Sequence, residues 1–190
     1  MAGRPPGFAA FVVPDTAPLH ELVREMRRLA RALPLAPLRE FEKKTRGLPW
    51  TTEAERLIVQ RVGQDVFRGA LMDYWGGRCA VTGCAEPLLL RASHIKPWAL
   101  CATDAERLDV KNGLLLAAHL DAAFDCGLID FDDAGQIRFS DRFAPADRLA
   151  AGLNEGMTLA KLTPEHRTFL AWRRAHLLTA GVCPPHSVDE

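Results

Sequence analysis

Two short apolar runs, "PLLLRASHI" at residues 87–95 and "NGLLLAA" at 112–118, constrain the fold more than any other feature of the sequence. The first run is bounded by turn-forming residues, as is "RCAVTG" at 78–83, and we expect a strand from each of them. The second run is expected to be a strand or an extended turn that leads into a short helix at 119–127. A strand, a connection, a second strand and a helix would bring the polar residues at their ends into one cleft.

The later elements are predicted from local signals. Residues 127–140, "GLIDFDDAGQIRFS", alternate apolar and polar side chains around a glycine-containing turn, which predicts a β-hairpin. A capping-box pair predicts one or two helical turns at 104–108. Thr163 and Pro164 occupy the cap and first-turn positions of a final helix that we expect to run to about Leu178.

The N-terminal part of the chain has a different pattern from the rest. Residues 1–15 look like a loose arm, and apolar residues then recur at helical spacing over residues 19–30. The proline-punctuated stretch at 33–50 is expected to be a linker or a short helix. The predicted organisation is an arm, amphipathic helix and linker at 1–50, a core domain at 51–180 and a tail at 181–190.

The core domain is expected to begin with two helices. Thr52 and Glu55 form a capping box that opens the first one. Gly63 is expected to interrupt this helix, and Asp65 is expected to cap a second helix that runs towards Trp75.

The charged residues are balanced in number but unevenly distributed. The chain has 24 Lys and Arg and 24 Asp and Glu, yet basic residues dominate residues 21–46 and acidic residues dominate residues 104–133. Two solvated surfaces of opposite sign would give this pattern. A basic face together with an acidic cluster is also what a metal-dependent enzyme acting on a polyanion needs.

Membrane and secretory features are not indicated by the sequence. No apolar run approaches the ~20 residues that span a bilayer, and the N-terminus lacks the order of a secretory signal. We therefore expect a cytoplasmic protein. The five cysteines are odd in number and have no repeating pattern, so we expect free thiols in a reducing compartment.

Polar residues stand at the ends of the small predicted elements. Each has a plain structural explanation when taken alone, since a histidine beside a tryptophan is often packed and an asparagine before glycine is often only a turn former. A histidine or aspartate at a helix start can act as a cap or favour the helix dipole. Their shared place at one predicted cleft favours a functional reading. These residues are Ser93, His94, Asn112, His119 and Asp121.

Three longer runs carry a resemblance to a known family. They are "RVGQDVFRGALMDYWGGRCAVTGC", "ASHIKPWA" and "NGLLLAAHLDAAFDCGLIDFDDAGQI". Together they resemble the HNH endonucleases, in the branch with an "HIKPW" first motif, over roughly residues 54–140. The resemblance implies an α+β fold with a ββα-metal core, flanking helices and a C-terminal helix. It also implies hydrolysis of phosphodiester bonds in DNA, with RNA not excluded.

The resemblance assigns roles to the polar residues. His94 corresponds to the general base, and an imidazole with an ordinary pKa near ~6.5 can accept a proton from water at neutral pH. Asn112 corresponds to the central asparagine, which would hold the loop and help to orient the base. His119 corresponds to the second histidine and is a candidate metal ligand. Asp121 lies nine positions after Asn112, where many relatives have a ligand, so either residue or both could hold the metal.

Ser93 is the point at which this sequence departs from many of its relatives. They carry an aspartate or histidine ligand directly before the base, so the serine weakens the expected set of metal ligands. A site of imidazole, carboxylate and water suits one divalent cation, with Mg²⁺ expected and Mn²⁺ or Ni²⁺ acceptable.

Other sites receive less support from the sequence. Some relatives hold a structural zinc ion with two cysteine pairs, but Cys79 and Cys84 are widely spaced and no second pair follows, so we do not expect zinc. Basic residues that flank the predicted cleft are candidates for contacts with phosphates. These are Arg91, Lys96 and Lys111.

Two other functions compete with a nuclease or add to it. The fold could be a catalytically inactive nucleic-acid-binding module that lost its metal at Ser93. The helix within residues 16–33 could form a homodimer or bind a partner protein, with the nuclease as its effector. The biological role stays open, because restriction, phage defence and mobile elements all use this fold.

Overall fold

The computed structural model describes residues 12–13 and 15–178 of the chain. The N-terminal helices are α1 (Thr16–Arg31), α2 (Ala36–Thr45) and α3 (Glu53–Trp75). The central elements are η1 (Pro87–Leu89), β1 (Leu90–His94), η2 (Trp98–Leu100), α4 (Asp104–Arg107), η3 (Val110–Asn112), β2 (Gly113–Ala117) and α5 (Ala118–Asp125). The C-terminal elements are β3 (Ile129–Phe131), β4 (Ile137–Phe139), α6 (Pro145–Ala150), α7 (Pro164–Arg173) and the π-helical turn η4 (Arg174–Leu178).

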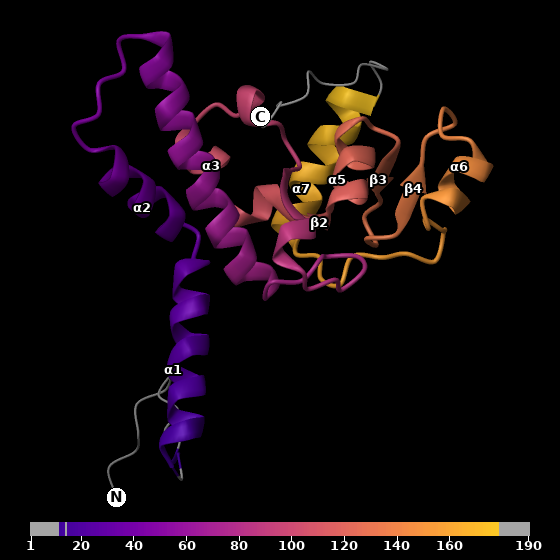
Figure 1. Ribbon diagram of the computed structural model, residues 1–190. Coiled ribbons are helices and arrows are strands. Elements are labelled where there is room, and N and C mark those ends of the chain that lie inside the picture. The colour runs from indigo at the N-terminus through magenta and orange to yellow at the C-terminus, as the bar shows by residue number, and fades with distance from the viewer. Residues whose placement is uncertain (1–11, 14, 179–190) are drawn as a thin grey trace, which may run out of the picture.

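A two-stranded antiparallel sheet forms the centre of the molecule (Figure 1). Strands β1 and β2 pair from Leu90 opposite Ala117 to His94 opposite Gly113. Helix α3 covers one face of this sheet and α5 covers the other. The predicted strand, connection, strand and helix are therefore confirmed, and so is the α+β class.

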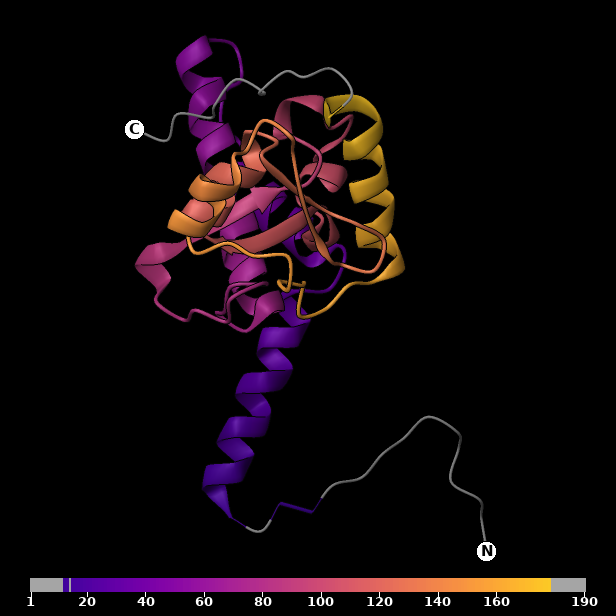
Figure 2. The ribbon, with the colours of Figure 1, turned by 90° about the vertical axis from the view of Figure 1, so that its right-hand side faces the viewer.

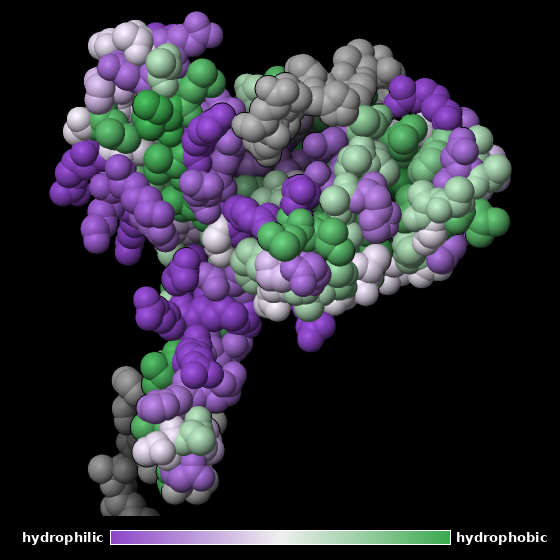
Figure 3. Space-filling view, viewed as in Figure 1, coloured by the Kyte–Doolittle hydropathy of each residue, from purple (hydrophilic) through white to green (hydrophobic). Residues whose placement is uncertain are grey.

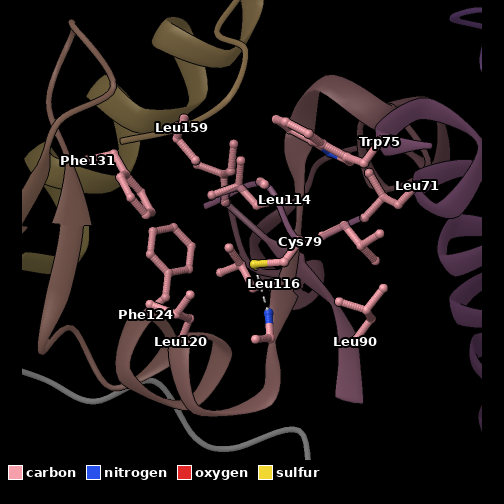
Figure 4. Close-up of a cluster of buried hydrophobic side chains, with 14 of the residues drawn as sticks. Leu71, Trp75, Cys79, Leu90, Leu114, Leu116, Leu120, Phe124, Phe131 and Leu159 are labelled. Carbon is pink, nitrogen blue, oxygen red and sulfur yellow. Dashed lines mark hydrogen bonds between the residues drawn. The ribbon is translucent and has the colours of Figure 1, made fainter. Parts of the chain in front are cut away.

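Apolar side chains from the sheet and from both covering helices form one hydrophobic core. Burying apolar side chains is the main favourable contribution to folding. The core continues from the sheet to the second hairpin, where the Phe124 and Phe131 rings lie 6.0 Å apart. Figure 4 shows part of this core, including Leu71, Trp75, Cys79, Leu90, Leu114, Leu116, Leu120, Phe124, Phe131 and Leu159.

Helix α3 begins where the sequence predicts and continues beyond the predicted break. The Thr52 hydroxyl accepts a hydrogen bond from the Glu55 amide at 3.2 Å, and the Glu55 carboxylate accepts one from the Thr52 amide at 2.9 Å. The prediction of two helices separated at Gly63 is wrong, because one helix runs through to Trp75. A Cβ atom at Gly63 would overlap with the Trp98 ring, so this glycine makes room for packing.

Helix α1 projects away from the rest of the molecule (Figures 1 and 2). It confirms the predicted amphipathic helix. The stretch after it, predicted as a linker or short helix, contains α2. Phe41 of α2 is buried and lies near Gly63 of α3.

The strand predicted at residues 78–83 is wrong. These residues form turns and contact β2 through one backbone hydrogen bond, from the Ala80 amide to the Leu115 carbonyl at 2.7 Å. The next predicted strand begins later than expected. Its first residues form η1, whose start is capped when the Glu86 carboxylate accepts a hydrogen bond from the Leu88 amide.

The C-terminal predictions agree with the structure. Strands β3 and β4 form the expected hairpin, whose turn contains Gly135 at φ 83° and is held when the Asp132 carboxylate accepts two backbone hydrogen bonds. The helical turn predicted at 104–108 is α4, and the final helix begins at Pro164. The proposed tail at 181–190 lies outside the described residues. Among the described helices, none has the length and apolarity that crossing a membrane requires.

Candidate active site

The end of the central sheet brings His94 and Asn112 together. His94 is the last residue of β1 and pairs with Gly113, the first residue of β2, so Asn112 lies just beyond the paired strands. The Ile95 amide donates a hydrogen bond to the Asn112 carbonyl at 3.0 Å and extends this pairing by one step. The sequence pattern predicted this proximity.

The His94 ring is held on three sides. It stacks on Phe67 of α3, with the ring centroids 3.8 Å apart, and meets the Trp98 ring edge-on at 5.6 Å. Its Nε2 atom lies 2.8 Å from the Arg107 carbonyl oxygen. Because a carbonyl oxygen can only accept, Nε2 carries the proton and the neutral ring keeps its lone pair on Nδ1.

Burial changes the protonation of His94. Desolvation lowers the pKa of this half-buried imidazole to about 4, and the hydrogen bond to the Arg107 carbonyl acts in the opposite direction. His94 is therefore neutral at physiological pH, which a proton acceptor requires.

Asn112 fixes the loop between the two strands. Its fully buried side chain accepts a hydrogen bond from the Lys96 amide at 2.8 Å and donates to the Lys96 carbonyl at 3.2 Å. It also donates to the Glu106 carbonyl at 3.2 Å, one residue before the carbonyl that holds His94. Asn112 thus ties the segment after His94 to the turn that orients its ring.

Ser93 and Asp121 meet on the other face of the sheet. Successive side chains of a strand point to opposite faces, and Ser93 accordingly faces α5 while His94 faces α3. The buried Ser93 hydroxyl donates a hydrogen bond to the Asp121 carboxylate. The cleft predicted from the sequence is therefore divided: His94 and Asn112 lie at the end of the sheet, and Ser93 and Asp121 lie between β1 and α5.

Part of the chain, including the site residues, matches a known protein family. The family described as HNH endonuclease matches residues 79–132, which contain both strands, the loop and α5. This segment belongs to the HNH endonuclease family. The resemblance predicted from the motifs is confirmed. No curated protein matches the chain.

Within the HNH segment, His119 and Asp121 have different surroundings. They stand two positions apart on α5, which separates their side chains by about 200° around a helix with 3.6 residues per turn. Asp121 faces β1, whereas His119 is exposed. Of the two candidate ligands, the geometry therefore pairs Asp121 with Ser93 and leaves His119 on the other side of the helix.

The Ser93 hydroxyl and the Asp121 carboxylate, between β1 and α5, are the candidate metal ligands of the site. A hydroxyl and a carboxylate are oxygen donors of the kind that Mg²⁺ prefers, and Mg²⁺ commonly keeps several water ligands. Among the described residues, no group of three or more His, Cys, Asp or Glu side chains is arranged to hold a metal. The fit is therefore to a loosely held, largely hydrated ion.

The three basic candidates have different partners. Lys96 pairs with Glu106 at 2.6 Å and lies over the Trp172 ring, so part of its charge is already neutralised. Arg91 is exposed, and its guanidinium donates to the main-chain carbonyl of Leu88. Lys111 donates to the Tyr74 hydroxyl at 2.8 Å.

Lys161 is distant from Lys111 in sequence, but both ammonium groups lie against the Tyr74 ring. Its ammonium lies 3.4 Å from the centre of the Tyr74 ring. Burial and the nearby charges of Lys111 and Arg28 lower the pKa of Lys161 to about 8. Lys161 is not among the residues predicted from the sequence, because no local pattern places it beside Tyr74.

Arg173 is a second residue that the sequence analysis missed. Its side chain is 1% exposed and reaches from α7 to both halves of the site. It donates to the Ile95 carbonyl at 3.3 Å, directly after His94, and to the Phe124 carbonyl in the last turn of α5. Its charge also lies near the carboxylate of Asp130, at 3.9 Å.

The cysteines of the described residues are free thiols. Cys79, the first candidate zinc ligand, is buried, and its sulfur accepts hydrogen bonds from the amides of Thr82 and Ala117. Cys84 is partly exposed. Burial raises the pKa of Cys101 to about 11, which keeps it protonated. Cys183 lies outside the described residues.

Proposed function

We propose that this protein is a metal-dependent endonuclease that hydrolyses phosphodiester bonds in DNA. The match to the HNH endonuclease family supports nuclease activity on nucleic acids in general. The observation that supports catalysis by this chain is the Arg107 carbonyl on Nε2 of His94, which leaves Nδ1 as the proton acceptor.

In this proposal His94 takes a proton from the attacking water. Phe67 and Trp98 restrict the imidazole to one orientation, and Asn112 holds the loop that carries the Arg107 carbonyl. A positioned general base contributes about 10²–10⁴-fold to a rate. Asn112 acts through the loop and is a positioning residue.

Asp121 and Ser93 are the proposed protein ligands of one divalent cation, Mg²⁺ in preference to Mn²⁺ or Ni²⁺. When bound, the ion would neutralise charge on the phosphate oxygens and support the leaving oxygen. Because His94 and Ser93 leave β1 on opposite faces, the scissile phosphate must lie at the end of the sheet, where both faces are within reach. His119 is not required as a ligand in this arrangement.

Basic residues provide the attraction for the phosphate backbone. Arg91 is an exposed residue of β1, Lys111 lies in η3 just before β2, and Lys161 adds a third cation beside Lys111. Lys96 contributes less, because its ion pair with Glu106 must be weakened before it binds a phosphate.

The test is cleavage of supercoiled plasmid by the purified chain with Mg²⁺, Mn²⁺, Ni²⁺ or EDTA. We expect nicked or linear DNA with a metal, and a rate at least about 100-fold lower for His94→Ala. His20→Ala, an exposed histidine on α1, is the matched control and should cut like the wild type. Equal cutting by wild type and His94→Ala would identify a contaminating nuclease. A labelled RNA of the same sequence, assayed in parallel, decides between DNA and RNA.

A second function is favoured by Ser93. The Ser93 hydroxyl and the Asp121 carboxylate meet at the proposed metal position, and no metal-binding group of three His, Cys, Asp or Glu side chains is found in the part of the chain that the structure describes. The protein could therefore bind nucleic acid on an HNH fold without cutting it. This alternative requires DNA binding that weakens steeply with salt, because binding would depend on phosphate contacts, and no cleavage with any metal. Cleavage that depends on His94 excludes it.

A further inference from the structure

Helix α1 carries an apolar surface that no described element covers, which we call the α1 stripe. None of the α1 residues is buried. The stripe side chains remain 38% to 61% exposed, although residues of this kind are usually placed inside proteins. They are Leu19, Leu22, Val23, Met26 and Leu29.

The spacing of the α1 stripe is that of a helix–helix seam. Leu19, Leu22, Met26 and Leu29 follow one another at intervals of three, four and three residues, and Leu33 beyond the helix continues the alternation. Such alternation places apolar side chains along one line of a helix and lets them interlock with a second helix. Val23 broadens the line on one side.

The other side of α1 attaches the helix to the body of the molecule. Arg28 donates to the Asp73 carbonyl, and Arg31 pairs with the Asp73 carboxylate at 3.1 Å, both at the end of α3. Beyond these contacts with the end of α3, the helix projects away from the central sheet (Figures 1 and 2), and Figure 3 shows hydrophobic side chains beside hydrophilic ones along it. A second helix can therefore lie along α1 without meeting the nuclease fold.

The charges of α1 are compatible with a second copy of the same helix. The positions that border the seam within α1 are Pro18, Val23, Glu25 and Ala30, and none of them is basic. Arg24 and Arg27 are exposed and lie away from the seam. Two copies can therefore pair without bringing their arginines together.

We propose that α1 pairs with α1 of a second copy through the α1 stripe, in a two-fold symmetric dimer. Two-fold dimers are the commonest symmetric assemblies, and such an interface uses the same surface on both subunits. Each helix is about 24 Å long at 1.5 Å per residue. A helix pair of this size buries less surface than the ~1,200–2,000 Å² of a standard interface. We therefore expect a weak dimer, whose fraction rises as the protein concentration rises.

The dimer has a consequence that depends on the proposed nuclease function. Two HNH segments in one assembly provide one site for each strand of a duplex. The dimer would then cut both strands in one encounter, whereas the monomer would nick one strand.

Analytical ultracentrifugation of the full chain across about 1–200 µM tests the dimer without DNA. We expect the wild type to shift from monomer to dimer over this range. Leu22→Glu combined with Leu29→Glu places charges in the seam and should remain monomeric throughout. Arg24→Gln combined with Arg27→Gln changes two exposed residues outside the seam and should dimerise like the wild type.

Circular dichroism checks that the variants stay folded, and Leu22→Ala with Leu29→Ala is a milder second variant. Alanine favours helix, so this pair should weaken dimerisation by tenfold or more without loss of helix. A wild type that is monomeric at every concentration overturns the proposal. This result would also be obtained if the α1 stripe binds a different protein instead of a second copy. A Leu22→Glu, Leu29→Glu protein that still dimerises also overturns it.

The DNA readout separates this proposal from the nuclease proposal. His94→Ala should dimerise normally and cut nothing. The Leu22→Glu, Leu29→Glu protein should still nick plasmid and should yield less linear product relative to nicked product. Dimerisation without any cleavage would keep the dimer and reject the nuclease.

Discussion

His94 illustrates how single contacts decide what a residue can do. A histidine in water has a pKa near ~6.5. The pKa of His94 is about 4, because burial against Phe67 and Trp98 removes water from the imidazole. The Arg107 carbonyl selects the tautomer. The ring is therefore ready to accept a proton at any pH above about 5 and is a weaker base than a free imidazole.

The pKa of His94 predicts the pH dependence of cleavage. The acid side of a kcat/KM profile reports the pKa of the essential base in the free enzyme. We expect kcat/KM for plasmid cleavage to stay flat from pH 8 down to about pH 6 and to fall only as pH approaches the pKa of His94. Circular dichroism at each pH confirms that the protein is folded. Half-maximal activity near pH 6.5 would show that the imidazole titrates as an exposed histidine.

Ser93 provides a second test at the scale of one residue. Ser93→Asp would place two carboxylates in contact, one from β1 and one from Asp121 on α5. Like charges this close repel, so we expect a lower melting temperature in EDTA than for the wild type. A divalent cation bound between them would restore stability, giving a larger rise in melting temperature with Mn²⁺ or Mg²⁺.

Ser93→Ala is the control for the metal-binding variant. It removes the hydroxyl without adding charge and should respond to metal no more than the wild type does. If Ser93→Asp shows no larger metal response than Ser93→Ala, the position between β1 and α5 is not a metal site.

Helix α3 shows what glycine does at the scale of an element. Gly63 and Gly69 lie in the same helix and have the same low helix propensity. Gly63 faces the Trp98 ring, whereas at Gly69 a Cβ atom would meet only the end of the Arg31 side chain at 3.7 Å. Sequence pattern alone treats both as weak points, yet only the first is a packing requirement.

The two glycines therefore predict opposite results. Gly63→Ala must displace Trp98 and should lower the free energy of unfolding by about 1–3 kcal/mol, as overpacking does. It should also reduce cleavage, because Trp98 packs against His94. Gly69→Ala should leave activity unchanged and raise the free energy of unfolding by about 0.5–1 kcal/mol. Urea unfolding and plasmid cleavage measure both effects. Equal behaviour of the two variants would mean that Trp98 does not depend on Gly63.

The stability of the whole molecule is expected to depend on buried ionisable groups. Burial lowers the pKa of His94 and of His166 to about 4, below the value of 6.5 in the unfolded chain. These groups stabilise the fold fully above pH 6.5, and this stability is lost as pH falls towards 4. Burial raises the pKa of Asp130 to about 6. Protonation of Asp130 therefore increases the stability of the fold as pH falls from 6 to 4, which partly offsets the loss from the histidines.

Two histidines against one aspartate predict a net loss of stability in acid. We expect the free energy of unfolding to fall by roughly 3 kcal/mol between pH 7.5 and 4.5, as measured by urea unfolding. His166→Gln removes one of the two groups and should make this fall clearly smaller, whatever its effect at pH 7.5. A fall of the same size in the variant would show that His166 is not buried in the neutral form.

Local order along the chain was enough to predict much of the fold. Capping residues, alternation in the hairpin and apolar runs act between neighbours in sequence, so the start of α3, the β3–β4 hairpin, and β2 followed by α5 could be read directly. The failures were Gly63, residues 78–83 and the start of β1. In each case contacts or caps specific to the folded chain prevailed over the pattern.

Motif and spacing were sufficient to identify the polar residues of the HNH segment, because they bring His94, Asn112 and Asp121 to neighbouring elements. The contacts that each of these residues makes depend on the folded chain. Asp121 meets Ser93 while His119 faces solvent, since a helix and a strand display adjacent residues on different sides. The Arg107 carbonyl on His94 and the buried Arg173 had no signal in the sequence, because contacts made by main-chain atoms and by residues distant in sequence leave no local pattern.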